Sequence, residues 1–212
     1  METDQTVYQY LTANLVGKSE EIVNRYSRRI AVFSDPPEIL GIGEIRLKSK
    51  LWDYLDEAIA GGITTLYTGL SYGADSAAAE LFAVRKQQNR DIRIVHIRTS
   101  PKWFSETDPA LQGFAVNTLQ KSTDYIRYTC GYPSGDSRIV RDRFIVDQCL
   151  HIVLILDFSV RTEDSYSWQL LEYALQPRKD SISHQVHIIS SENEPCCREN
   201  TGKEVPVQAL LF

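Results

Sequence analysis

Short apolar runs alternate with longer amphipathic segments along most of this chain. A run that is apolar throughout, such as HIVLILDF at 151–158, is typical of a strand buried on both faces. Segments whose apolar residues recur three and four positions apart indicate helices. The predicted strands cover 28–34, 63–69, 92–98, 124–129, 151–158 and 184–190, and the predicted helices cover 5–27, 44–62, 74–89, 109–122, 137–149 and 165–176.

This alternation predicts an α/β fold with a doubly wound, mostly parallel sheet in three layers. Parallel neighbours need a crossover connection, and each interval between the predicted strands has room for a helix. We expect a Rossmann-like domain at 28–190, preceded by an N-terminal helical extension at 1–27. The segment 191–212 is expected to form a C-terminal appendage.

The composition narrows the class of protein. Of 212 residues, 42% are hydrophobic, which is enough for a buried core, and the longest apolar runs are too short to span a bilayer. The formal net charge of −5 argues against nucleic acid as a partner, because nucleic-acid binders more often carry a basic excess. The N-terminus lacks the pattern of a secretory signal, and the four cysteines show no C-x-x-C spacing. We therefore expect a cytoplasmic protein with no metal site and no membrane association.

The stretch TGLSYGADSAAAE at 68–80 places glycines, hydroxyls and a carboxylate between a predicted strand and a predicted helix. Ligands of open parallel sheets bind beyond the carboxyl ends of the strands, so this turn is a candidate binding loop. Free amides at a helix start attract anions, and glycines let the backbone approach a ligand closely. A tight packing turn with a helix-capping carboxylate explains the same residues, and the spacing leaves both interpretations open. The candidate ligand-binding residues are Thr68, Gly69, Gly73, Asp75 and Ser76.

The stretch SRIVRDRFIVDQ at 137–148 carries three further candidates, Arg138, Arg141 and Arg143. Arg138 and Arg141 are three residues apart and share a face of the predicted helix. Cations at a helix start are unfavourable beside the helix dipole, which indicates that nearby acids or a bound phosphate compensate them. A solvated basic face with salt bridges explains the same pattern.

Three stretches together resemble the YpsA-like branch of the SLOG superfamily, which includes DprA-type DNA-processing proteins and LOG-type phosphoribohydrolases. They are AVFSDPPEILGIGE, LYTGLSYGADSAAAE and RDRFIVDQCLHIVLILD, and the resemblance runs from about residue 29 to residue 190. It implies a SLOG-type fold with a pocket for a nucleotide or an ADP-ribose-like ligand, and no other cofactor is indicated. Ser34 stands in the family's first turn, where Thr-Gly is the usual pair. Trp103 resembles the family's aromatic loop residue, which implies stacking on a base or lining the pocket.

The resemblance implies a sensor or regulatory module that binds a nucleotide-type small molecule and signals to a protein partner, as a homo-oligomer. One alternative is a nucleotide N-glycosidase or phosphoribohydrolase-like enzyme, with Glu80 as general acid/base and Arg141 as phosphate clamp. The LOG-type signature Pro-Gly-Gly-x-Gly-Thr-x-x-Glu is absent after the fifth predicted strand, so we expect binding rather than catalysis. The other alternative is an interaction protein with a vestigial pocket.

Overall fold

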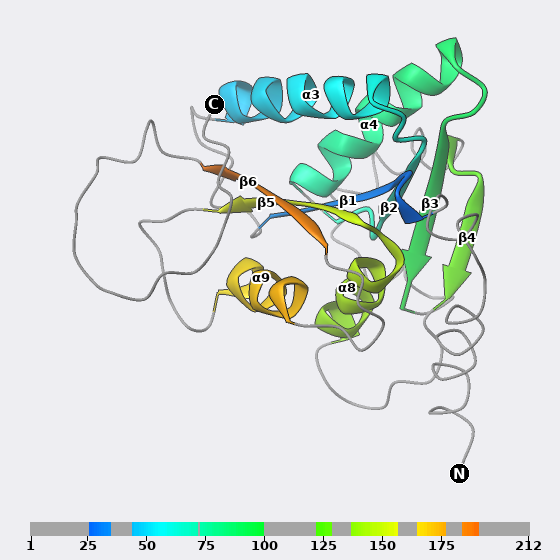
Figure 1. The fold of residues 1–212 in the computed structure, drawn as a ribbon. Coiled ribbons are helices and arrows are strands. Elements are labelled where there is room, and N and C mark those ends of the chain that lie inside the picture. Colours follow the sequence, from blue (N-terminus) through cyan, green and yellow to red (C-terminus); the bar gives the residue numbers. More distant parts are fainter. Residues whose placement is uncertain are drawn as a thin grey trace.

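Six strands form one sheet in the computed structural model, and every neighbouring pair is parallel (Figure 1). The structure describes residues 26–34, 44–71, 73–99, 122–128, 137–156, 165–176 and 184–190. The predicted fold class is confirmed as a Rossmann-like α/β fold. The strands are β1 (Arg29–Ser34), β2 (Thr65–Thr68), β3 (Arg93–Arg98), β4 (Tyr125–Tyr128), β5 (His151–Leu156) and β6 (Gln185–Ser190).

The strand order, β4-β3-β2-β1-β5-β6, reverses at β1. From β1 the chain adds β2, β3 and β4 on one side, and then adds β5 and β6 on the other side. In open α/β sheets, such a reversal lies beside the crevice where ligands bind, at the carboxyl ends of the strands. At that end, Ser34 of β1 pairs with Ile155 of β5. The carboxyl edge of the sheet is therefore the first place to look for a site.

The described helices cover both faces of the sheet (Figure 1). The helices α3 (Glu44–Ala60) and α4 (Ala74–Gln88) lie on one face, and α8 (Ser137–Gln148) and α9 (Tyr166–Leu175) lie on the other. Successive side chains of a strand point to opposite faces. Ile30 and Val32 therefore join the core beneath α3 and α4, whereas Ala31 and Phe33 join the core beneath α8 and α9. The three predicted layers are confirmed.

The observed bounds of these elements lie within two residues of the predicted ones. α3 ends at Ala60 because the chain turns at Gly62, which has a φ of 106°. β2 begins two residues later than predicted, because the Ile63 amide still donates to the Ala58 carbonyl of α3. The predicted helix at 109–122 and most of 1–27 and 191–212 lie outside the described residues, so the division of the chain into extension, domain and appendage stays a prediction.

Candidate functional site

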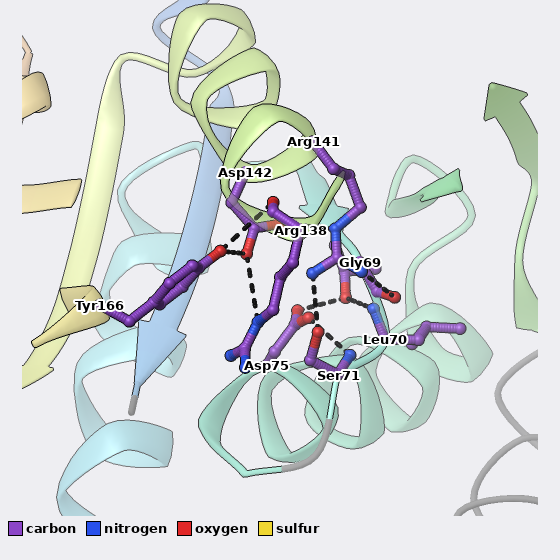
Figure 2. Close-up of polar contacts among 9 residues, drawn as sticks. Gly69, Leu70, Ser71, Asp75, Arg138, Arg141, Asp142 and Tyr166 are labelled. Atoms are coloured by element: carbon purple, nitrogen blue, oxygen red, sulfur yellow. Dashed lines mark hydrogen bonds and ion pairs between the residues drawn. The ribbon is translucent and has the colours of Figure 1, made fainter. Parts of the chain in front are cut away.

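The carboxyl ends of β1, β2 and β3 share one edge of the sheet. There β1 ends at Ser34 and β2 ends at Thr68, which pairs with His96 of β3. α8 packs over these three strands and brings its arginines to the same edge. We call the resulting group of polar residues the carboxyl-edge cluster (Figure 2). Its members are Thr68, Gly69, Leu70, Ser71, Asp75, Arg138, Arg141, Asp142 and Tyr166.

Asp75 closes the turn between β2 and α4. Its carboxylate accepts hydrogen bonds from the Thr68 hydroxyl and from the Ser71 amide, the latter at 2.9 Å, and the Leu70 amide donates to Thr68 Oγ1 at 2.9 Å. Only 5% of Asp75 is exposed. Burial raises the pKa of Asp75 to about 6, although the Thr68 hydroxyl and the charge of Arg141 oppose the rise. This geometry favours the interpretation of Asp75 as an acid that stabilises the turn by accepting hydrogen bonds from it.

The two glycines of the turn accommodate side chains from other elements. A Cβ at Gly69 would lie 2.6 Å from Nε of Arg141, and a Cβ at Gly73, where φ is 100°, would lie 2.8 Å from Oγ of Ser34. That Ser34 hydroxyl accepts a hydrogen bond from the first amide of α4, at Ala74, over 3.1 Å. Ser76 donates to the Gly73 carbonyl at 2.9 Å. The glycines are thus explained by packing, and their assignment to ligand binding stays a prediction.

Arg141 ties α8 to this turn. Its guanidinium donates to Asp142 Oδ1 at 2.6 Å, to Ser71 Oγ at 2.8 Å and to the Gly69 carbonyl at 3.4 Å. Only 5% of its side chain is exposed. Burial by itself would lower the pKa of Arg141, but Asp142 and Asp75 outweigh that effect and hold the pKa above its ordinary value. Arg141 is therefore a buried, charged clamp between α8 and the β2–α4 turn, which Figure 2 shows.

Arg138 lies one turn earlier on α8, in a more accessible position. Its side chain is 30% exposed, and its guanidinium carbon stacks 4.3 Å from the centre of the Tyr166 ring. Nε of Arg138 lies 3.9 Å from Asp142 Oδ2. The Tyr166 hydroxyl donates to that same Oδ2 and lies 3.3 Å from the Arg138 carbonyl oxygen. Arg138 therefore faces the cluster from its edge, supported by an aromatic ring of α9.

His96 and Arg98, near the end of β3, were not among the candidate ligand-binding residues predicted from the sequence. Both are buried, and Arg98 donates to Nδ1 of His96 at 3.3 Å. Burial, together with the charges of Arg98 and Arg141, lowers the pKa of His96 to about 3. The sequence does contain a feature that could have identified them, because His96 and Arg98 are polar residues at the carboxyl end of an apolar strand. Tyr166 was also missed, although it lies at the start of the helix predicted at 165–176.

Two further predicted site residues, Glu80 and Arg143, contact other side chains instead of the cluster. Glu80 forms an ion pair with Lys48 of α3 at 2.6 Å, and exposed Arg143 lies 5.2 Å from the ring of Tyr173. Trp103 lies outside the described residues. The roles predicted for these three residues stay predictions. Among the described residues, no helix could cross a membrane, and no group of His, Cys, Asp or Glu side chains is arranged to hold a metal ion.

Among the described residues, the carboxyl edge carries more positive than negative charge. Arg98, Arg138 and Arg141 gather there with two aspartates, Asp75 and Asp142, whereas His96 is neutral at pH 7 because of its low pKa. This local excess contrasts with the formal net charge of −5 for the whole chain. An anionic group would therefore be attracted to this edge.

No known protein family matches the chain, and no curated protein matches it. Among solved structures, the chain is similar to DNA processing protein A from Helicobacter pylori, with 11% identity and a TM-score of 0.49 over 80% of this chain and 68% of that chain. It is also similar to DprA from Streptococcus pneumoniae, with 13% identity and a TM-score of 0.44 over 79% of this chain. The chain spans about half, 51%, of the Streptococcus pneumoniae protein.

These comparisons correct one expectation. The Helicobacter pylori protein is described by its mode of binding single-stranded DNA. The net charge led us to expect that nucleic acid is not a partner of this chain, and that expectation is wrong. Net charge describes the whole surface, whereas binding depends on local charge.

Proposed function

We propose that the chain is a SLOG-type module of the YpsA-like branch that binds a nucleotide or an ADP-ribose-like molecule at the carboxyl edge of its sheet. In this proposal the ligand's phosphate meets Arg138, and the bound state is passed to a protein partner. The observation that carries the proposal is the partly exposed Arg138 side chain, whose guanidinium stacks on Tyr166 beside a buried ionic cluster.

Arg138 has the properties of a phosphate ligand. A guanidinium presents a planar fork of N–H donors that matches the oxygens of a phosphate. Arg138 lies in the first turn of α8, and that turn itself contains no acidic residue. A phosphate at this position would interact favourably with both the side chain and the helix start.

Arg141 has a different role in the proposed site. Its donors already bind Asp142, Gly69 and Ser71, so a phosphate would have to displace buried hydrogen bonds to reach it. We therefore assign the phosphate contact to Arg138 and the fixing of the β2–α4 turn to Arg141. A rigid turn keeps the carboxyl edge in one conformation, so that a ligand does not have to order this turn when it binds.

The hydrolase alternative receives no support from the described geometry. Its general acid/base, Glu80, pairs with Lys48 across the α3–α4 face rather than with the carboxyl-edge cluster. The sensor role, the homo-oligomer and the cytoplasmic location remain parts of the proposal to be tested.

Thermal shift and calorimetric titration of the full chain test this function. The ligand panel contains inorganic phosphate, AMP, ADP, ATP, NAD, ADP-ribose and a single-stranded oligonucleotide. We expect at least one nucleotide-type ligand to stabilise the protein, because a ligand that binds only the folded state raises its stability. Stabilisation by the oligonucleotide alone would redirect the function to nucleic-acid binding, and no response to the whole panel would contradict the proposal.

The variant Arg138→Gln identifies the site, and Arg143→Gln is its matched control on the same helix. Charge-assisted hydrogen bonds contribute about 1.5–3 kcal/mol, so Arg138→Gln should weaken the affinity at least about tenfold. Arg143, over Tyr173, should be replaceable without loss. Equal affinity of the wild type and Arg138→Gln would exclude Arg138 as the phosphate contact.

A further inference from the structure

β4 lies at one end of the sheet and exposes apolar side chains. Among the described strands, only β3 pairs with it (Figure 1). Tyr125 is 58% exposed and Ile126 is 46% exposed, and only two other large hydrophobic side chains of the described residues, Val84 and Leu175, are comparably exposed. We call the side of β4 that points away from β3 the β4 edge. An outer edge of this kind, flanked by apolar groups, readily accepts another strand.

The exposed side chains of β4 lie on both faces of the sheet. Tyr125 lies beside Val95, whose side chain belongs to the core beneath α8 and α9. Ile126 lies beside His96 and points to the opposite face, and exposed Arg127 returns to the face of Tyr125. A helix docked here would cover only one of these faces, whereas a strand added to the β4 edge places its own side chains beside both. The exposure pattern therefore favours a strand as the partner.

The β4 edge is complementary to a second copy of itself. Tyr125 and Arg127 are the two neighbours of Ile126 along the strand. When two such strands run antiparallel about a twofold axis at Ile126, each Tyr125 lies opposite Arg127 of the second copy, and the two Ile126 side chains meet. Directly opposite side chains lie about 4.5–5.5 Å apart at Cβ, close enough for a cation–π contact and an apolar pair. A register that placed Arg127 opposite its own copy would instead bring two like charges together.

We propose that the β4 edge is the interface between two copies of this chain, which pair their β4 strands antiparallel about a twofold axis at Ile126 and form one continuous sheet. The interface lies on a different surface from the proposed ligand site. Antiparallel pairing points the carboxyl edges of the two sheets in opposite directions, so each copy keeps its own carboxyl-edge cluster. Dimer formation is therefore independent of the ligand and is measured without one.

Sedimentation of the ligand-free full chain, over a range of concentrations, compares Ile126→Lys with Val84→Lys. Val84 lies on α4 and is 45% exposed, so it is a matched control for a charge at an exposed apolar site. We expect the wild type to form a dimer, and we expect Ile126→Lys to raise its dissociation constant at least about a hundredfold, because two ammonium groups would meet at the axis. Val84→Lys should change it less than about twofold. A monomeric wild type, or equal effects of the two variants, would overturn the inference.

Two substitutions of Tyr125 test the pairing itself. Tyr125→Glu and Tyr125→Lys both lose the ring, but the glutamate would lie opposite Arg127 of the second copy, whereas the lysine would oppose a like charge. We expect the dimer of Tyr125→Glu to have a dissociation constant at least about tenfold lower than that of Tyr125→Lys. Net charge would act the other way, because an added lysine reduces the repulsion between two chains of formal net charge −5.

Equal dissociation constants of the two Tyr125 variants would overturn the proposed pairing. Slow hydrogen exchange of the β4 amides in a monomeric wild type would show that another segment of the same chain covers the edge, and would also overturn the inference. Circular dichroism checks that every variant folds, as expected for substitutions at exposed positions. Nucleotide binding by a monomeric protein would support the proposed function and still exclude this interface.

Discussion

The guanidinium of Arg141 lies against the backbone of Gly69 and donates to its carbonyl oxygen at 3.4 Å. A Cβ at position 69 would lie 2.6 Å from Nε of Arg141, too close for any side chain larger than hydrogen. This contact joins α8 to the β2–α4 turn and places both candidate segments of the sequence in one cluster.

Replacing Gly69 with alanine should destabilise the protein. Overpacking a filled site typically costs about 1–3 kcal/mol, and here the displaced group is a buried arginine with three hydrogen-bond acceptors. Urea denaturation measures the loss. Gly61→Ala is the control, because a Cβ there would meet its nearest atoms at 3.4 Å, an ordinary contact distance. Equal stabilities of the two variants would contradict the close approach of Arg141.

Removing the charge of Arg141 should lower the free energy of unfolding more than removing the charge of Arg143. Breaking a buried ion pair by removing one partner costs about 3–5 kcal/mol, because the other charge stays buried. Arg141→Met leaves Asp142 and Asp75 without their shared cation, whereas exposed Arg143→Met should change the stability little. Arg141→Lys should not restore it, since an ammonium lacks the planar fork. The free energies of unfolding of the three variants provide the check.

Asp75 should give the protein an acid-dependent gain in stability. Its folded pKa of about 6 lies above its ordinary value of 3.8, so the folded state binds the proton more tightly than the unfolded state. The contribution is fully present below about pH 4 and is lost as the pH rises through about 6. A shift of roughly two pKa units corresponds to about 3 kcal/mol.

Asp75→Asn isolates this effect, because an amide mimics the protonated carboxyl. The Thr68 hydroxyl can then accept instead of donate, and the Ser71 amide keeps an oxygen acceptor. The difference in unfolding free energy between the wild type and this variant should fall as the pH rises from 4 to 7. Parallel stability curves over that range would show that Asp75 does not titrate there.

His96 should change the pH dependence of stability in the direction opposite to that of Asp75. Its folded pKa of about 3 lies below the ordinary value of 6.5, so its contribution to stability is present above about pH 6.5 and is lost as the pH falls toward 3. Ring ¹⁵N shifts should therefore show a neutral imidazole from pH 8 down to about 5. A titration midpoint near pH 6.5 would contradict the burial of His96 beside Arg98. Between pH 4 and 6 the two residues oppose each other, so the wild-type profile alone cannot separate them.

The fold and the meeting of the two candidate segments were predictable from the sequence. Six apolar runs separated by helical intervals leave few arrangements other than a parallel sheet covered on both faces. The carboxyl ends of parallel strands share an edge, which is why the turn after Thr68 meets a cluster of arginines on a later helix.

The division of roles within the site was not predictable. Arg138 and Arg141 share a helical face by spacing, and only the positions of Gly69 and Ser71 decide which of them is buried. The sequence between β5 and Tyr166 does not indicate how α9 is positioned relative to the rest of the fold. Its contact with Asp142 therefore depends on tertiary packing that no local pattern encodes.

We propose that a phosphate-bearing ligand binds at the carboxyl edge through Arg138. Titration of the ¹⁵N-labelled full chain with ADP and ADP-ribose tests this binding site residue by residue. We expect chemical-shift changes concentrated at Gly69, Ser71, Arg138 and Tyr166, with the Arg138 Nε–H among the largest. Shift changes centred on other elements, or none at millimolar ligand, would contradict it.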